Sequence, residues 1–296
     1  MSEDTLLYEK DGAVTRLVLN RPEKHNALTF AMFDRLVEML HEAEDDDDTK
    51  VIILKGNGPS FCSGHDLSEV GFVYGFGEGE TEEGRRRRPS QRVRLQFDRK
   101  LLEKYMAFQY SMKPIIAQVQ GHCIGAGFFL TELVDLAICA DTASFSHAEQ
   151  RLMGGGRSLI LNAQMLAYGP KRARELLLLG RTLDGKQAVD LGVVNRSVPE
   201  DELEATVEDW AEQICRHPKD GLVIGKAFNQ LALESFGYTA QIWRGYIGHT
   251  LNTNIRFEDD EYNFFRERRE RGVGDAAHGR DEFFSEDDTG GREESQ

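Results

Sequence analysis

Two glycine-rich turns hold the residues best suited to chemistry in this chain of 296 residues. The second turn contains Gly121, Gly125 and Gly127 and opens an apolar helical segment, after which a carboxylate follows at Glu149. Glycines at the start of a helix let backbone N–H groups approach a ligand oxygen closely. Backbone donors fixed in this way can stabilise an oxyanion, and a carboxylate nearby can move protons.

The first turn lies upstream, in the segment from Phe61 to Leu67, and it directly follows the apolar run from Val51 to Leu54. Two donor turns that each follow a strand predict a site with two backbone donors. Neither turn is specific alone. Their order and their separation of roughly 60 residues make the pair informative.

Strand and helix patterns alternate around these turns. The spacing of Phe33, Leu36, Val37, Leu40 and Ala43 predicts one apolar face of a helix, and a further helix is expected to begin near residue 92. Apolar runs predict strands at 13–19, 51–56, 114–120 and 134–140. The alternation predicts an α/β layered core with mostly parallel strands.

The organisation along the chain follows from composition. We expect an α/β core over 1–200, a C-terminal helical region over 201–284, and a disordered tail over 285–296. Residues 71–95 are rich in Gly, Glu and Arg and predict a long loop inserted after the first turn. Within that loop, Arg85–Arg88 reads either as a solvated tract or as a phosphate-binding run.

Composition also limits the partners. The chain has 36 Lys and Arg against 51 Asp and Glu, a net charge of −15, which disfavours nucleic acid as a partner. No apolar run is long enough to span a bilayer, so no membrane partner is expected. The first residues, Met1 to Asp4, lack the pattern of a signal peptide, and we predict a cytoplasmic protein.

The four cysteines show neither a CxxC motif nor zinc-ligand spacing, so no metal site is predicted. We expect inert thiols, with a reactive thiol at Cys62 or Cys123 as the alternative, because both adjoin a donor turn.

Taken together, the two turns resemble those of the crotonase (enoyl-CoA hydratase/isomerase) superfamily. Three further segments carry the resemblance, which extends over roughly 5–284: LNRPEKHNAL at 19–28, KPIIAQVQG at 113–121, and residues 180–198. It implies a crotonase-like ββα spiral core with a C-terminal helical region. It also implies an acyl-CoA-processing enzyme, with coenzyme A entering as part of the thioester substrate and no tightly bound cofactor. The expected assembly is a homotrimer or a dimer of trimers.

The resemblance assigns roles to particular residues. The backbone N–H groups of His65 and Ala126 would hold the thioester oxygen, and Glu149 would be the acid/base. Many family members have Gly where this chain has Ala126, but Ala keeps its N–H. Many hydratases of the family carry a second glutamate three residues after that donor, where this chain has Phe129.

Three residues are candidates to replace the missing acid: His147, Glu132 and His122. Each is also explained by a structural role. On a strand-like segment, His147 would face the same side as Glu149. Phe129 itself indicates an apolar acyl pocket, to which Tyr74, Tyr105, Tyr110 and Trp243 are candidate wall residues. We expect the substrate to contact residues of the family motifs: Lys24 and Ala27 for coenzyme A, then Ser63, Asp66, Leu67, Gly125, Phe129 and His147.

Several reactions remain open. Loss of one acid weakens two-acid hydration, yet a lone base suffices for a double-bond isomerase, and hydroxycinnamoyl-CoA hydratase-lyases also lack that glutamate. Hydratase or hydratase-lyase and isomerase therefore rank together. A hydrolase or a retro-Claisen C–C bond hydrolase follows. The rivals from other classes are a non-catalytic acyl-CoA binding protein and an RNA-associated relative that uses Arg85–Arg88.

Overall fold

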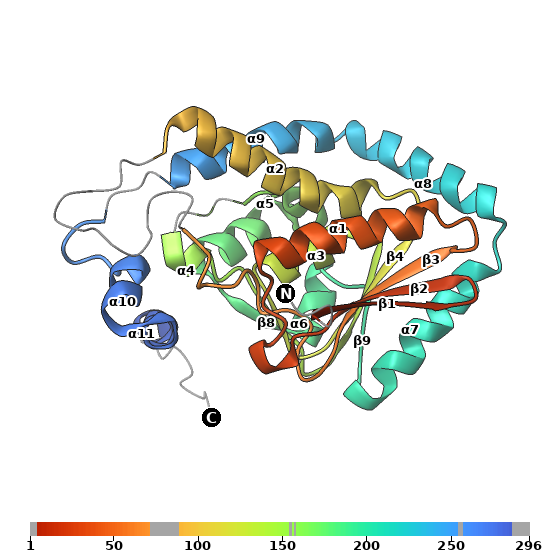
Figure 1. Ribbon diagram of the computed structural model, residues 1–296, viewed down its shortest axis with the longest axis horizontal. Helices are drawn as coiled ribbons and strands as arrows, with labels where there is room; N and C mark the ends of the chain where they lie inside the picture. The colour runs from red at the N-terminus through yellow and green to blue at the C-terminus, as the bar shows by residue number, and fades with distance from the viewer. Residues whose placement is uncertain (1–4, 72–88, 154–155, 157, 254–256, 286–296) are drawn as a thin grey trace, which may run out of the picture.

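The central element is a six-stranded sheet, shown in Figure 1 for a computed structural model that describes residues 5–71, 89–153, 156, 158–253 and 257–285. The strand order is β1-β2-β3-β4-β6-β9; β1 pairs antiparallel with β2 and every other pair is parallel. The strands are β1 (Leu6–Asp11), β2 (Val14–Leu19), β3 (Val51–Gly56), β4 (Ile115–Val119), β6 (Leu136–Ala140) and β9 (Arg196–Val198). A second sheet has the order β5 (His122–Ile124), β7 (Ser144–Ser146) and β8 (Thr182–Asp184).

The apolar runs explain the central strands. In β3, five of the six residues are buried, as expected for a parallel strand that is covered on both faces. The four strands predicted from sequence begin and end within two residues of β2, β3, β4 and β6. The predicted α/β class with mostly parallel strands is confirmed.

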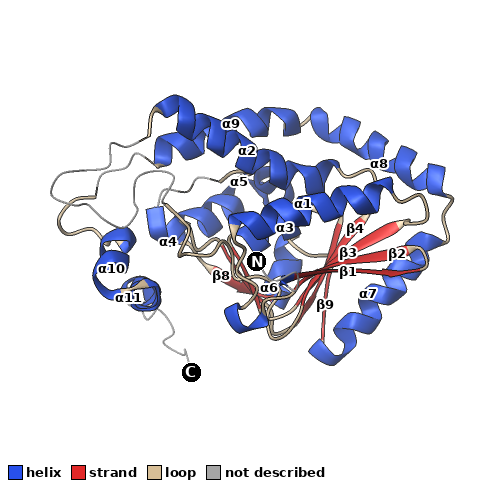
Figure 2. Cartoon of the chain, in the orientation of Figure 1, coloured by secondary structure: helices blue, strands red, loops and turns tan. Residues whose placement is uncertain are grey.

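Helices cover both faces of this sheet (Figure 2). On one side lie α1 (Phe30–Asp45) and α2 (Gln91–Tyr110), and on the other α7 (Glu200–Cys215) packs on β3, β4 and β6. Residues 91–95, the last part of the predicted loop at 71–95, are helical, because α2 already begins at Gln91. Tyr74 and Arg85–Arg88 lie outside the described residues.

The shorter helices of the core connect its sheets. They are α3 (Ala126–Leu133), α4 (Gln150–Met153), α5 (Leu161–Leu179) and α6 (Gly185–Leu191), with a 3₁₀ turn at Pro22–Lys24. Gly180 and Gly192 end α5 and α6 in the left-handed conformation, which glycine adopts without steric cost.

The rest of the chain is helical: α8 (Lys219–Glu234), α9 (Tyr238–Asn252), α10 (Phe264–Arg271) and α11 (Val273–Ser285). Helix α9 packs along α2, whereas α10 and α11 lie at one end of the molecule beside α4 (Figure 1). The buried Arg268 of α10 donates hydrogen bonds to the carbonyl oxygens of Leu67 (2.8 Å) and Val70 (2.6 Å). The C-terminal helices are thereby tied to the segment after the first donor turn. The expected domain bounds stay a prediction, and 286–296 lie outside the described residues.

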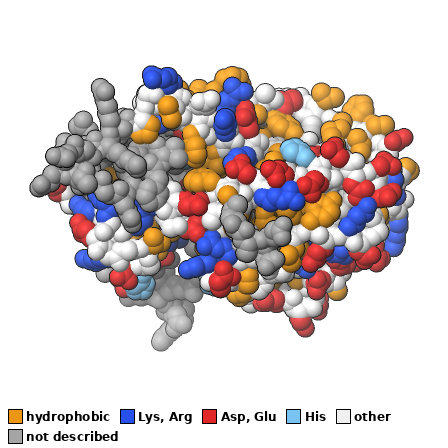
Figure 3. Space-filling view, in the orientation of Figure 1, with side chains coloured by type: hydrophobic (Ala, Val, Ile, Leu, Met, Phe, Trp, Pro, Cys, Tyr) orange, Lys and Arg blue, Asp and Glu red, His pale blue; other side chains and the backbone are white. Residues whose placement is uncertain are grey.

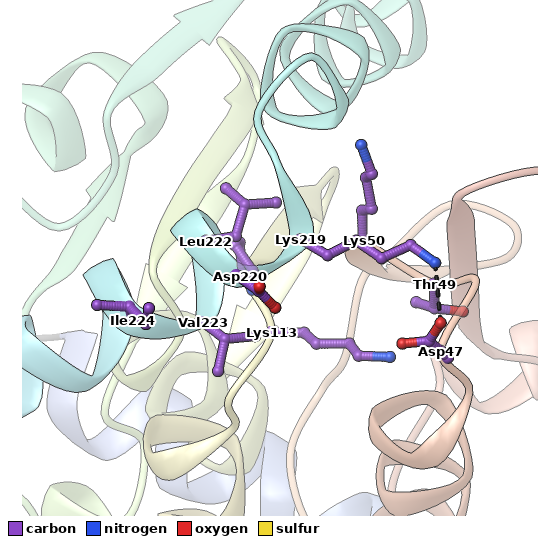
Figure 4. Close-up of a pocket in the computed structure, with 10 residues that line it drawn as sticks. Asp47, Thr49, Lys50, Lys113, Lys219, Asp220, Leu222, Val223 and Ile224 are labelled. Atoms are coloured by element: carbon purple, nitrogen blue, oxygen red, sulfur yellow. Dashed lines mark hydrogen bonds and ion pairs between the residues drawn. The ribbon is translucent and has the colours of Figure 1, made fainter.

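Three lysines hold α1 and α7 in place at the edge of a hollow of about 170 Å³ (Figure 4). Lys113 donates to the carbonyl oxygens of Ala43 and Asp46 at the end of α1, and Lys50 donates to those of Cys215 and His217 at the end of α7. Lys219 pairs with Asp47 at 3.1 Å. The ammonium groups of Lys113 and Lys50 thus satisfy carbonyls at helix ends, which otherwise lack partners.

In the part of the chain that is described, no helix combines the length and the apolar composition that crossing a membrane requires.

Candidate active site

The two donor turns lie against each other. Cys62 and Cys123 form a parallel β-bridge, in which Cys62 N–H donates to His122 O and Ile124 N–H donates to Cys62 O, each at 2.9 Å. A Cβ atom on Gly64 would stand 3.1 Å from the carbonyl oxygen of Ile124. Segments that are roughly 60 residues apart in sequence are thus brought into contact.

Each turn directs one N–H group away from the bonded backbone. Leu28 N–H donates to Gly64 O and Asp66 N–H donates to Leu28 O, both at 2.8 Å, so the intervening His65 N–H faces the other way. Ala126 is the first residue of α3, where N–H groups have no partner within the helix. Within the described residues, neither N–H donates to another protein group.

Gly125 sets the direction of the second donor. Its φ of 52° and ψ of −109° lie in a region that residues with a side chain rarely adopt. Its own N–H is bonded to Ser146 O at 2.9 Å, at the end of β7. This turn, which glycine adopts without a Cβ clash, sends the chain directly into α3.

A cavity of about 850 Å³ opens beside these two donors. Ten of the eleven residues proposed for the site line it. The structure thus brings together Lys24, Ala27, Ser63, His65, Asp66, Leu67, Gly125, Ala126, Phe129 and Glu149. The exception is His147, which is completely buried and lies behind the cavity wall.

Glu149 projects its carboxylate beside the second turn, since a Cβ atom on Gly125 would lie 3.6 Å from its Oε2. It is one of three carboxylates that line the cavity from described residues. The other two are held in ion pairs with arginine: Asp66 with Arg21 at 2.7 Å and Asp281 with Arg280 at 2.8 Å. Glu149 pairs with the imidazole of His147, whose Nδ1 lies 3.0 Å from Oε1.

The proximity of His147 to Glu149 has a different cause from the strand predicted in the sequence. Strand β7 ends at Ser146, and residues 147–149 form a turn that leads into α4. The ring of His147 stacks on Phe128 at 4.4 Å and contacts Phe129 at 4.7 Å. Burial opposes its charged form, but the attraction of Glu132 and Glu149 outweighs it and raises the pKa of His147 to about 10.

The other two candidates for the missing acid differ in placement. Glu132 does not line the cavity; its side chain is 3% exposed and accepts hydrogen bonds from Gln164 and Tyr168. His122 does line the cavity, near the ring of His25, and burial, then the nearby His25, lowers its pKa.

The imidazole of His65 faces α2. Its Nε2 lies 2.8 Å from the hydroxyl of Tyr105, and burial lowers the pKa of His65 to about 4. The ring is therefore neutral at pH 7, and only its backbone N–H is placed to bind an oxygen. Of the described aromatic residues proposed as pocket walls, Tyr105 lines the cavity, whereas Tyr110 and Trp243 do not.

Basic side chains line the cavity at the predicted coenzyme A segment. Lys24 is exposed there, on the 3₁₀ turn, and Arg21 bridges the Ala27 carbonyl (3.2 Å) and Asp66 (2.7 Å). The predicted coenzyme A segment thus borders the same groove as the first donor turn.

Sequence reasoning missed the residues that α9 and α11 contribute. His249 lines the cavity, and its Nδ1 lies 3.0 Å from Oδ1 of the buried Asp98 on α2. Arg280 and Asp281 of α11 line the mouth. Asp98 and His249 are 151 positions apart, so no local motif connects them.

The thiols beside the turns are not activated. Cys62 and Cys123 are fully buried; burial raises the pKa of Cys62 to about 12 and holds the pKa of Cys123 well above its usual value. Over the described ranges, no group of three or more His, Cys, Asp or Glu side chains is arranged to hold a metal ion.

Comparison with known proteins places the chain in a family. The family model described as enoyl-CoA hydratase/isomerase matches residues 9–240. A hydroxycinnamoyl-CoA hydratase-lyase from Pseudomonas fluorescens is 33% identical over 205 residues, which are 69% of this chain and 70% of the relative. The chain therefore belongs to the enoyl-CoA hydratase/isomerase family, and the resemblance found in the sequence is confirmed.

Solved structures agree with this assignment. An enoyl-CoA hydratase/isomerase from Xanthobacter autotrophicus Py2 superimposes with a TM-score of 0.81 at 28% identity, over 94% of this chain and 98% of that one. A monofunctional enoyl-CoA isomerase from M. smegmatis gives a TM-score of 0.60 at 26% identity, over 78% and 94%. The crotonase-like fold is thus confirmed, as is the expectation of an enzyme of the lyase or isomerase type.

Proposed function

We propose that this enzyme is an enoyl-CoA hydratase or hydratase-lyase that uses a backbone oxyanion hole and a single glutamate. The observation that carries the proposal is the meeting of the His65 N–H, the Ala126 N–H and the Glu149 carboxylate at one cavity. The similarity to a hydroxycinnamoyl-CoA hydratase-lyase supports the hydratase or lyase direction over isomerisation.

The proposed reaction uses Glu149 twice. The carboxylate removes a proton from water as the oxygen bonds to the β-carbon, and the electrons of the double bond move onto the thioester oxygen. The two N–H groups stabilise the resulting enolate. Glu149 then returns the proton to the α-carbon, so that one molecule of water has been added.

Phe129 fits this scheme. It lines the cavity where many relatives have an acid, and together with Tyr105, at a ring distance of 5.7 Å, it gives the pocket an aromatic wall. Such a wall favours a flat, unsaturated or aromatic acyl group. At the mouth, Lys24 and Ala27 are proposed to contact coenzyme A, which enters as part of the substrate.

The isomerase keeps one specific observation in its favour. Phe129 lines the cavity where many relatives carry a second acid, and a lone base such as Glu149 is sufficient to move a proton between two carbons. Water as a reactant is what separates the two reactions.

The test is a panel of saturated, 2-enoyl, 3-enoyl, aryl-enoyl and β-keto CoA thioesters, read by mass spectrometry. We expect a mass gain of water on a 2-enoyl or aryl-enoyl compound. Unchanged mass with a shifted ultraviolet spectrum would indicate the isomerase. Free coenzyme A, or a shortened chain from the β-keto compound, would indicate a hydrolase or C–C bond hydrolase. A shortened chain with release of an aldehyde from the aryl-enoyl compound would instead indicate the hydratase-lyase.

Glu149→Gln provides the first mutational prediction. Removal of the acid/base should lower kcat by about 10²- to 10⁴-fold, while the affinity for the saturated thioester butyryl-CoA stays within about twofold. Glu38→Gln, on the exposed face of α1, is the matched control and should leave both unchanged. A wild-type protein that binds thioesters but turns over none would instead be the non-catalytic acyl-CoA binder.

We also propose that the enzyme assembles as a homotrimer or a dimer of trimers. Large apolar side chains are exposed along α8 and α9, at Ile224, Phe228, Leu231, Trp243 and Leu251. Figure 3 shows hydrophobic side chains gathered over α8. An apolar surface of this kind is typical of subunit contacts. A cytoplasmic location and the absence of nucleic-acid and membrane partners stay predictions.

A further inference from the structure

A row of buried polar side chains runs from Glu149 away from the cavity. The imidazole of His147 lies between two carboxylates, with Nδ1 3.0 Å from Glu149 Oε1 and Nε2 3.3 Å from Glu132 Oε2. The ring is completely buried, and the Glu132 side chain is 3% exposed. One imidazole therefore bridges the proposed acid/base and a second carboxylate that substrate does not reach.

Glu132 is anchored from α5. The hydroxyl of Tyr168 donates to its Oε1. The carboxamide nitrogen of Gln164 lies 2.9 Å from the same oxygen and 2.8 Å from Nε2 of His147, so Gln164 contacts both groups. Burial raises the pKa of Tyr168 well above its usual value, so the phenol stays a donor. These hydrogen bonds hold the Glu132 carboxyl group in place at the far side of His147.

The ring itself is held in plane. Phe128 stacks on it with an interplanar angle of 17°, and Phe129 contacts its edge region at a tilt of 43°. An imidazolium against an aromatic face is favoured electrostatically. Phe129 thus forms a wall of the slot that holds His147, at the position where many relatives carry an acid.

We propose that His147 is a positioning residue, an imidazolium that Glu132 holds in place and that fixes the ionised Glu149 carboxylate in the cavity. This inference rests on the proposed acid/base role of Glu149. It adds a function for Glu132, His147 and Phe129, none of which needs to touch the reacting atoms. When Glu149 takes up a proton, the remaining Glu132–His147 pair is neutral overall, so no uncompensated buried charge results.

The protonation of His147 can be measured without turnover. In the full chain labelled with ¹⁵N-histidine, the His147 signals, assigned by their loss in His147→Gln, should remain those of an imidazolium at pH 8. In the Glu132→Gln variant, the pKa of His147 should be lower than in the wild type, because one of its two neighbouring carboxylates is lost. A neutral His147 ring at pH 7 in the wild type would overturn the proposal whether or not the enzyme turns over the thioester panel.

Kinetics then test positioning. His147→Gln keeps a hydrogen-bonding side chain without the charge, and should lower kcat by about 10- to 100-fold with KM within about twofold, since slight misplacement of a catalytic group is costly. The acid limb of the pH–kcat profile should move to higher pH, because a carboxylate ionises less readily without a cation beside it. Glu132→Gln should shift the acid limb of this profile in the same direction by a smaller amount.

His41→Gln is the matched control, because His41 pairs with Glu44 at the same 3.0 Å on the exposed side of α1. It should change neither kcat nor the pH profile. A lower melting temperature for His147→Gln with an unmoved acid limb would show a purely structural role and refute the inference. If Glu149→Gln retains full activity, the proposed function fails, while the ¹⁵N titration still reports on the pairing of His147.

Discussion

At the scale of single residues, the pKa values of two histidines close to the cavity are shifted in opposite directions. His65 is buried with the Tyr105 hydroxyl as its polar neighbour, and its pKa falls to about 4. His147 is buried between two carboxylates, and its pKa rises to about 10. Burial acts against the charged form in both cases, so it is the neighbouring carboxylates that decide the outcome.

His65 makes stability sensitive to acid. The unfolded chain binds a proton here below about pH 6.5, and the folded chain does so only below about pH 4, so folding loses free energy as pH falls between those values. The loss should approach about 3 kcal/mol at pH 4. The His65→Gln variant has no such titrating group. In urea unfolding, the difference in unfolding free energy between wild type and variant should therefore become smaller as the pH falls from about 6.5 to about 4. A gap that stays constant with pH would contradict a neutral buried His65.

At the scale of elements, the local patterns were sufficient for strands and turns. The apolar runs of β3 and β4 and the glycines around Gly125 act over a few neighbouring residues, so the sequence carries them directly. His147 was expected beside Glu149 on a strand, but a turn brings them together. The pairing of Asp98 with His249 depends on α2 packing against α9, which no local pattern encodes.

We predict that the turn before α3 requires glycine at position 125. Gly125→Ala should destabilise the protein by about 1–3 kcal/mol, because alanine is strained at this φ and ψ, and should lower kcat by displacing the Ala126 N–H. Gly225→Ala, within α8, is the contrasting control. Nothing lies within 4 Å of the added methyl, so this change should stabilise by up to about 1 kcal/mol. Equal effects of the two substitutions on urea unfolding would show that the turn is not strained.

At the scale of the whole molecule, the exposed apolar residues of α8 and α9 predict assembly. Phe228 and Leu231 are 68% and 67% exposed on α8. Replacing both by Glu should place charge in a subunit contact and reduce the mass measured by light scattering to that of a smaller species. Ala205→Glu, on the exposed side of α7, should leave the mass unchanged. A wild-type protein that is monomeric at micromolar concentration would disprove the proposed oligomer.

Because Arg268 anchors α10 to the carbonyl oxygens of Leu67 and Val70, α10 and α11 can change in sequence while their position beside the cavity is kept. The proposed backbone donors and Glu149 come from the sheet-containing part of the chain, whereas α9 and α11 supply part of the cavity's lining. A chimaera that exchanged α10 and α11 for those of a relative, and kept the arginine, would alter which substrates enter while the reacting groups stayed where they are. One part of the cavity lining can thus change without the stretch of chain that holds Glu149.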